Sequence, residues 1–210
     1  FREIIEEPRV SACLVGPGNG VTVATREKVL AVLRQKLPLV LDADAISVFE
    51  ETRDLLFSSI ESPCLMTPHD GEFERVFIVE GHKVARVRQA AQLSGATVLL
   101  KGADTVIAAP DGRVAINDNA PPELATAGAG DVLAGFGVGL LARGLDPFAA
   151  GCIATWLHGE AARAFGPGLR SDELALCLAQ THVAQEQAAL ELDRHVCTVL
   201  AEDERRLRER

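Results

Sequence analysis

The chain has 210 residues, 48% of them hydrophobic, and a formal charge of −9 at pH 7. This length suits one domain with a sizeable core. The charge disfavours nucleic acid and anionic membrane surfaces as partners, because both are bound by clustered lysine and arginine. No run of about eighteen apolar residues and no leader pattern occurs, so we expect a cytoplasmic protein that does not enter a membrane.

The cysteines are few and scattered, at Cys13, Cys64, Cys152, Cys177 and Cys197. An odd number without a CxxC pair argues against zinc binding and redox chemistry. We therefore expect buried, reduced thiols and no metal site built from cysteine.

The first part of the chain predicts a strand, a helix and a second strand. An apolar run over 10–15 stops at the glycine-rich segment 16–20, and helical spacing follows over 29–37. The buried-strand run 38–41 then ends in Asp-Ala-Asp-Ala at 42–45. This order predicts a right-handed parallel unit, and ligands of such folds gather at the carboxyl ends of the strands.

The same pattern is repeated further along the chain. The run 63–66 predicts a third strand and ends in TPHDGEF at 67–73. Helical spacing over 84–93 precedes another strand at 97–100, which ends in KGADT at 101–105. We expect these segments to open onto the same edge of the sheet.

After that edge the pattern changes to a hairpin and then to helices. The runs 106–109 and 113–116 flank Pro-Asp-Gly and predict a β-hairpin. Helices are predicted over 132–141 and 147–165. His158, in the second helix, lacks the HExxH spacing of a zinc ligand, so we interpret it as a packed or helix-surface histidine.

The central segment is ATAGAGDVLAG, at 125–135, where glycines lead into an apolar helix. Gly128 and Gly130 allow a tight turn and a close ligand, and a helix N-terminus suits a phosphate or a developing anion. Asp131 at this junction has two readings. It stabilises the first helical turn electrostatically, or it is a base that takes a proton from a hydroxyl attacking phosphorus.

These motifs, weak singly, together resemble a known family in order and spacing. The AGAGD segment is similar to the GTGD or GSGD signature of the ribokinase-like superfamily. VGPGNG, LDADA, TPHDGEF and KGADT are similar to segments of the ADP/ATP-dependent NAD(P)H-hydrate dehydratase family within that superfamily. The chain departs from the common family pattern at Asp70, where proline is usual, and at 120–123, where GNPG is usual.

The resemblance implies a role for each matching residue. Asp131 would be the catalytic base and, with Gly18 and His69, would contact the hydrated substrate. The backbone of Gly128, Ala129 and Gly130 would form the anion hole. The nucleotide would be bound by Lys101, Gly102, Ala103, Asp104, Thr105 and Gly130.

The resemblance also implies a fold and an activity. We expect an α/β, ribokinase-like domain over 1–170, with a mostly parallel sheet flanked by helices and without the family's N-terminal elements. The resemblance fades beyond residue 169, and the charged composition of residues 171–210, rich in Gln, Glu and Arg, predicts a helical or partly disordered extension. The implied activity is ADP-dependent (S)-NAD(P)H-hydrate dehydratase, a hydro-lyase that repairs NADHX and NADPHX with ADP or ATP as phosphoryl donor and Mg²⁺ as cofactor, giving AMP from ADP.

Two alternatives remain open at this point. A kinase of a small vitamin-precursor alcohol uses the same GxGD chemistry, and TPHDGEF with KGADT speaks against it. An inactive nucleotide-binding interaction module is the other. Because family members usually carry more sheet before the position of Phe1, we expect the first strand to leave an exposed edge and the chain to form a homo-oligomer.

Overall fold

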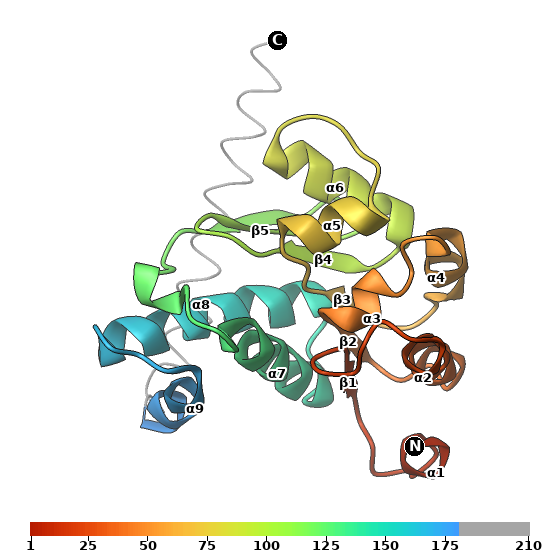
Figure 1. Ribbon diagram of the computed structural model, residues 1–210, viewed down its shortest axis with the longest axis horizontal. Helices are drawn as coiled ribbons and strands as arrows, with labels where there is room; N and C mark the ends of the chain where they lie inside the picture. The colour runs from red at the N-terminus through yellow and green to blue at the C-terminus, as the bar shows by residue number, and fades with distance from the viewer. Residues whose placement is uncertain (181–210) are drawn as a thin grey trace.

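The computed structural model describes residues 1–180, with side chains up to Cys177 (Figure 1). Its centre is a six-stranded sheet in the order β1-β2-β3-β4-β5-β6, in which the first four strands are parallel and the last two antiparallel. The strands are β1 Cys13–Val15, β2 Leu39–Leu41, β3 Cys64–Met66, β4 Thr97–Leu100, β5 Thr105–Ala108 and β6 Val114–Asn117. Strand order therefore follows chain order across the sheet.

Helices cover both faces of the sheet and make three layers (Figure 1). The helices packed on one face are α2 Val23–Arg34, α3 Asp44–Ser47, α4 Arg53–Ser59, α5 Asp70–Val76 and α6 Lys83–Ser94. On the other face lie α7 Ala129–Ala142 and α8 Pro147–Phe165. The remaining helical segments are α1 Arg2–Ile5, the 3-10 turn Pro122–Leu124 and α9 Ser171–Gln180.

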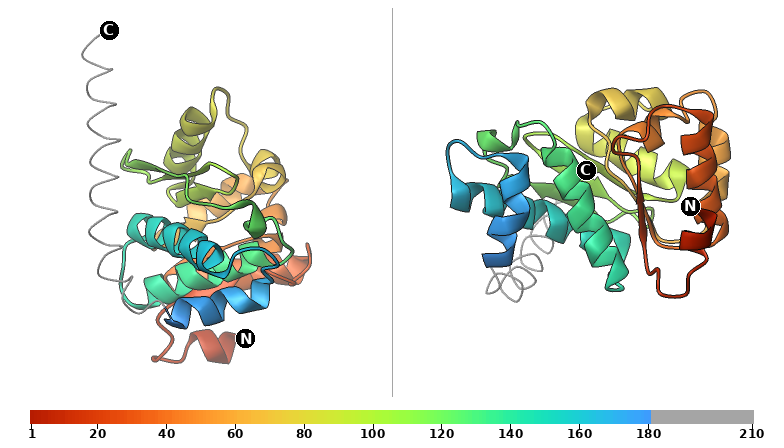
Figure 2. Two further views of the ribbon diagram at one scale, coloured as in Figure 1. Left: turned by 90° about the vertical axis from the view of Figure 1, so that its left-hand side faces the viewer. Right: turned by 60° about the horizontal axis from the view of Figure 1, so that its bottom comes forward.

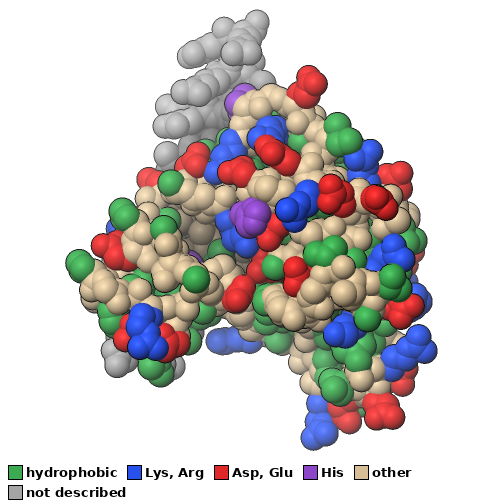
Figure 3. All heavy atoms as spheres, in the orientation of Figure 1, with side chains coloured by type: hydrophobic (Ala, Val, Ile, Leu, Met, Phe, Trp, Pro, Cys, Tyr) green, Lys and Arg blue, Asp and Glu red, His purple; other side chains and the backbone are tan. Residues whose placement is uncertain are grey.

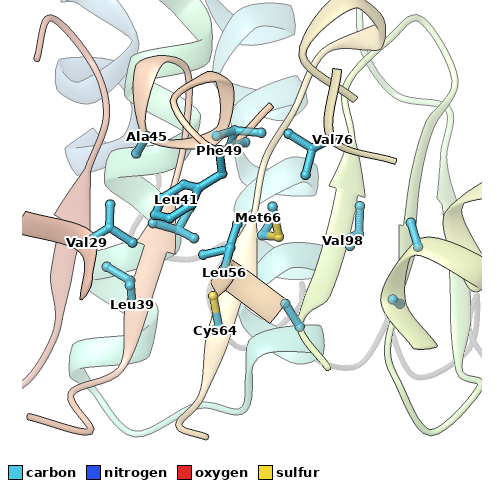
Figure 4. Close-up of a cluster of buried hydrophobic side chains, with 14 of the residues drawn as sticks. Val29, Leu39, Leu41, Ala45, Phe49, Leu56, Cys64, Met66, Val76 and Val98 are labelled. Atoms are coloured by element: carbon cyan, nitrogen blue, oxygen red, sulfur yellow. The ribbon is translucent and has the colours of Figure 1, made fainter. Parts of the chain in front are cut away.

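The alternation of side chains along each strand builds the two halves of the core. Leu39 and Leu41 of β2 lie near side chains of α2, α3 and α4, as Figure 4 shows, whereas Val40 between them packs under α7 and α8. All three are fully buried, which explains why the strands are continuous apolar runs instead of alternating ones. The sequence pattern therefore matches a sheet that is covered on both faces.

The predicted α/β fold is confirmed, including the parallel units and the β5–β6 hairpin. As expected, β1 lies at one edge of the described sheet. Cys64 and Cys152 are buried free thiols, while Cys13 and Cys177 are partly exposed; Cys197 lies outside the described residues. None of the described helices is long and apolar enough to cross a membrane.

The segment from Ser171 onwards is only partly described. Helix α9 packs beside α7 and α8, as both views in Figure 2 show, and Leu174 is completely buried there. Residues 181–210 lie outside the described part, so the proposed division between 1–170 and 171–210 stays a prediction.

Candidate active site

The carboxyl ends of β1 to β4 meet at one edge of the sheet because the strands are parallel and in register. Val15, Leu41 and Met66 are neighbours in that register, so the residues after them are neighbours too. This places Asp42 and Thr67 side by side, and Lys101 after β4 reaches Asp42 as well. The edge predicted from the sequence therefore brings its polar residues together.

Asp42 is the buried centre of this edge, with 1% of its surface exposed. Its Oδ1 accepts hydrogen bonds from the Lys101 ammonium at 2.7 Å and from the Thr67 hydroxyl at 2.9 Å. Its Oδ2 is buried without a hydrogen-bond partner among the described residues. Buried charges require such compensation, so the pair with Lys101 joins β2 to the end of β4.

The Gly16–Gly20 loop lies against the same strand end. A side chain at Gly16 would collide with the backbone carbonyl of Asp42, so only glycine allows this approach. The backbone N–H of Gly20 donates to Asp44 Oδ2 at 2.7 Å, which ties the far end of the loop to the start of α3. Gly18, between these two anchors, is exposed and has a φ of +67°, so its backbone faces solvent beside the edge.

His69 and Glu72 form a capping box at the start of α5. The His69 N–H donates to Glu72 Oε2 at 2.9 Å, and the Glu72 N–H donates to His69 Nδ1 at 3.2 Å. The neutral ring therefore carries its proton on Nε2, which lies 3.2 Å from Glu72 Oε1. The His69 side chain is 57% exposed, so it remains accessible at the mouth of the site, and Asp70 does not disturb the cap.

The central segment forms the N-terminus of α7. Gly128 is the N-cap residue with a φ of +84°, and Ala129, Gly130 and Asp131 make the first turn without a side-chain cap. The Ala129 N–H donates to the Thr126 carbonyl at 3.2 Å, which leaves the N–H groups of Gly130 and Asp131 and the helix dipole available to an anion. The Asp131 carboxylate is exposed, and it has no hydrogen bond or ion pair within the part of the chain that the structure describes.

Lys101 adds a positive charge to this helix N-terminus. Its ammonium would lie only 3.3 Å from a β-carbon built on Gly130, so glycine leaves room for it beside the first turn. Glu72 Oε2 lies 3.8 Å from the same ammonium. The helix N-terminus and the lysine together have the positive charge and the donors that suit a phosphate group.

A cavity of about 500 Å³ opens next to this anion site. Much of its wall is apolar, which suits the faces of a planar base. The lining residues are Lys101, Gly102, Ala103, Thr105, Ala120, Pro121, Pro122, Leu124, Ala125, Ala129, Gly130, Leu133, Thr155 and His158. The structure thus gathers the sequence-predicted nucleotide residues around one cavity, except for Asp104.

Asp104 and Thr105 shape the turn after β4. The Asp104 carboxylate accepts from the Lys83 ammonium at 2.7 Å and does not line the cavity. This hydrogen bond is the main cause that lowers the pKa of Asp104. The Thr105 hydroxyl donates to the Gly102 carbonyl at 2.9 Å, and it accepts from the Gly102 N–H at 3.2 Å.

His158 is a cavity residue that sequence reasoning missed. Its burial confirms the packed interpretation, but no sequence signal indicated the cavity. Burial lowers the pKa of His158 to about 4, against a smaller opposing effect of a hydrogen bond with the Ala129 backbone. With this pKa the ring is neutral at pH 7. Its Nε2 has no hydrogen-bond partner in the described chain, so one ring nitrogen is unsatisfied.

Asn119, a second missed residue, fixes the loop that covers the cavity. Its side-chain amide donates to the Trp156 carbonyl and to Glu160, each at 3.0 Å. A side chain at Gly159 would overlap Asn119, so this glycine permits the loop to dock on α8. The departure from the common family pattern at 120–123 therefore lies in a loop that Asn119 fixes to α8.

A helix N-terminus beside an apolar cavity, at the carboxyl ends of parallel strands, is the arrangement typical of nucleotide-binding α/β proteins. On the face seen in Figure 3, acidic and basic side chains are interleaved and not separated by sign.

The chain belongs to the NAD(P)H-hydrate dehydratase family, whose model matches residues 2–166.

Relatives of known name agree with this assignment. The Bifunctional NAD(P)H-hydrate repair enzyme Nnr of Salinibacter ruber is 44% identical over 159 residues, which cover 74% of this chain and 29% of that protein. The ADP/ATP-dependent NAD(P)H-hydrate dehydratase of Bacillus subtilis, co-crystallized with ATP and Mg²⁺, is 30% identical and superposes with a TM-score of 0.74 over 85% of this chain and 69% of that one.

The fold is ribokinase-like. A ribokinase-like superfamily protein of Enterococcus faecalis is 25% identical and has a TM-score of 0.71, covering 86% of this chain and 64% of that one. The chain spans less than a third of the length of the Salinibacter relative.

Proposed function

We propose that the chain carries out nucleotide-dependent dehydration of (S)-NADHX and (S)-NADPHX. Its family membership supports the reaction, and the geometry of one residue supports the mechanism. Asp131 stands exposed in the first turn of α7, without a partner among residues 1–177, directly after the glycines of the turn and beside the cavity that Lys101 lines. This position suits a base that acts on a hydroxyl next to a phosphoryl group.

In the proposed reaction, Asp131 takes the proton of the hydroxyl on the reduced nicotinamide ring. The hydroxyl oxygen bonds to the terminal phosphorus of ADP, the bridging P–O bond breaks, and AMP leaves. The ring C–O bond then breaks with loss of a proton from the adjacent carbon, which releases phosphate and restores the dihydronicotinamide. The N–H groups around Gly130 stabilise the charge on the phosphoryl group during transfer.

The contacts suggest a division of the site into two subsites. The cavity and the turn 101–105 would bind the nucleotide, with Lys101 directed at its phosphates. Asp104 would act through the backbone of this turn, because its carboxylate is held by Lys83. Gly18 and His69, which follow β1 and β3, would contact the hydrate.

Magnesium fits this site only with help from the nucleotide. The described residues contain no group of three or more His, Cys, Asp or Glu side chains that could hold a metal ion. Asp42, whose Oδ2 is buried and unpaired, and Glu72 are the carboxylates that would hold Mg²⁺, with nucleotide phosphates and water completing its shell. The bound ion would neutralise phosphate charge.

The homo-oligomer and the cytoplasmic location stay predictions.

Replacement of Asp131 tests the proposal. We expect Asp131→Asn to lower turnover by roughly 10²-fold or more while ADP affinity stays near the wild-type value, because only the base is lost. The matched control is Asp54→Asn, which removes another exposed aspartate from the first turn of a helix, α4, away from the site. The assay follows NADHX loss with ADP or ATP, and calorimetry measures ADP binding.

Two results would contradict the proposal in different ways. Unchanged turnover of Asp131→Asn at saturating substrates would remove Asp131 as the base. No NADHX loss with either nucleotide in the unsubstituted chain, despite ADP binding, would instead favour a different reaction at the same site.

A further inference from the structure

Helix α9 lies beyond residue 166, where the family match ends, yet it packs against the site. Leu174 is fully buried in a small cluster under α7 and α8, separate from the two clusters that flank the sheet. The buried members of this cluster are Ala129, Ala161, Ala162, Leu169 and Leu174. Figure 2 shows α9 lying along the outer side of α7 and α8.

Members of this cluster also form the wall of the cavity. Ala129, which is buried in the cluster, lines the cavity, and so does Leu124, which packs against the cluster from the covering loop. The start of α9 reaches the signature itself, because a β-carbon on Gly128 would lie 2.9 Å from the Ser171 hydroxyl. Helix α9 therefore contacts both the Gly128–Asp131 turn and residues that line the cavity.

That turn has little support from its own residues. The N-terminus of α7 has no side-chain cap, and its N-cap Gly128 has a backbone that glycine alone adopts readily. Gly130 in the first turn adds further freedom. Phosphoryl transfer nevertheless requires the N–H groups to be fixed closely in position. Contacts from outside the turn, such as the hydrogen bond between His158 and the Ala129 backbone, must therefore help to order it.

We propose that α9 is a positioning element of the nucleotide site. Leu174 packs in one cluster with Ala129 and with Leu124 of the covering loop, and this packing fixes the N–H groups of the first turn of α7. The inference rests on the proposed function in that the ligand of this turn is taken to be the phosphate group of a nucleotide.

The experiment compares three leucine-to-alanine variants. Leu174→Ala removes the side chain under the turn. Leu176→Ala is the control on the same helix, because Leu176 is 67% exposed. Leu56→Ala is the control for general loss of stability, because Leu56 is completely buried in the cluster on the opposite face of the sheet. All are measured well below their melting temperatures, and Leu174→Val serves if the alanine variant does not fold.

Two readouts decide the outcome. We expect Leu174→Ala to weaken ADP binding about tenfold, a loss of about 1.4 kcal/mol, and adenosine binding much less, because the phosphate-binding turn is affected. We also expect faster hydrogen exchange in the peptide 124–136 of this variant. Leu56→Ala and Leu176→Ala should show neither change. In Leu174→Met, which keeps a long apolar side chain, ADP affinity and the exchange of 124–136 should both match the wild type.

The opposite results are equally clear. Equal ADP affinity and equal exchange in Leu174→Ala and Leu56→Ala would overturn the role of α9. If the unsubstituted chain binds no ADP, the proposed function fails, and the exchange of 124–136 alone decides whether α9 orders the turn.

Discussion

Two lysine–aspartate pairs each include one residue of the turn 101–105. The pairs differ in burial although their N–O distances are equal. Lys101 and Asp42 are 2.7 Å apart with side-chain exposures of 18% and 1%. Lys83 and Asp104 are also 2.7 Å apart, but their exposures are 24% and 68%. The comparison teaches that distance alone does not tell which ion pair stabilises the fold more, because solvent screens the exposed pair and not the buried one.

The partners of each pair show what it contributes. Asp42 joins the ends of three strands, since it also accepts from Thr67 after β3, and its pair with Lys101 points the ammonium at the N-terminus of α7. Lys83 donates to the Asp104 carboxylate and to the Asp104 backbone carbonyl, both at 2.7 Å. The exposed pair therefore braces a single turn, whereas the buried pair holds the centre of the site.

Breaking the buried pair should have the largest effect. Among the described residues, Asp42→Ala leaves the Lys101 ammonium with Glu72 alone, at 3.8 Å, so we expect the free energy of unfolding to fall by about 3–5 kcal/mol. Urea denaturation followed by circular dichroism measures the change. The double variant Asp42→Leu/Lys101→Met should recover much of this loss, because no charge is left unpaired. A loss below about 1 kcal/mol in Asp42→Ala would make the two pairs equivalent.

His158 sharpens the comparison because it is a buried titratable group that has no charged partner in the part of the chain that the structure describes. Burial lowers its pKa from 6.5 to about 4 in the folded chain, so between these values the unfolded chain binds a proton that the folded chain does not. Acid therefore favours unfolding, and the stability present above pH 6.5 should fall by about 3 kcal/mol as the pH approaches 4.

Urea titrations at several pH values between 4 and 7.5 test this expectation. His158→Leu should lose this part of the pH dependence. His82→Gln, which changes an exposed histidine at the start of α6, should keep it. Parallel pH profiles for the wild type and His158→Leu would show that other groups cause the acid sensitivity.

Much of the fold could be predicted from the sequence, because the parallel strands are short apolar runs with glycine or polar residues directly after them. The positions of Gly128, Gly130 and Asp131 at a helix start were predictable for the same reason: an abrupt change from small residues to an apolar helical pattern. The segments at 16–20 and 67–73 were placed correctly at the same sheet edge, since parallel strands put all their carboxyl ends on one side.

The remainder depended on contacts between distant residues. Lys101 and Asp42 are 59 positions apart, and nothing local shows that the lysine is paired with that aspartate. His158 has an ordinary place in an apolar helix, so only the cavity gives it meaning. Leu174 lies in a charged segment with weak periodicity, and its burial arises from the surfaces of α7 and α8. Such features follow from packing and not from spacing along the chain.

Breaking the exposed pair should have the smallest effect. The pKa of Asp104 is lowered, so its pair with Lys83 stabilises the folded chain above pH 3.8 and the contribution is lost as the pH falls through the folded pKa. Solvent screening limits this contribution, and we expect Asp104→Asn to lower the free energy of unfolding by less than about 1 kcal/mol. In about 1 M salt, where the screening length is about 3 Å, the difference should vanish, unlike that of Asp42→Ala. ADP affinity measured on the same variant separates the two roles of this residue. It should stay unchanged if the carboxylate only braces the turn, and a clear loss would mean that Asp104 contacts the nucleotide directly.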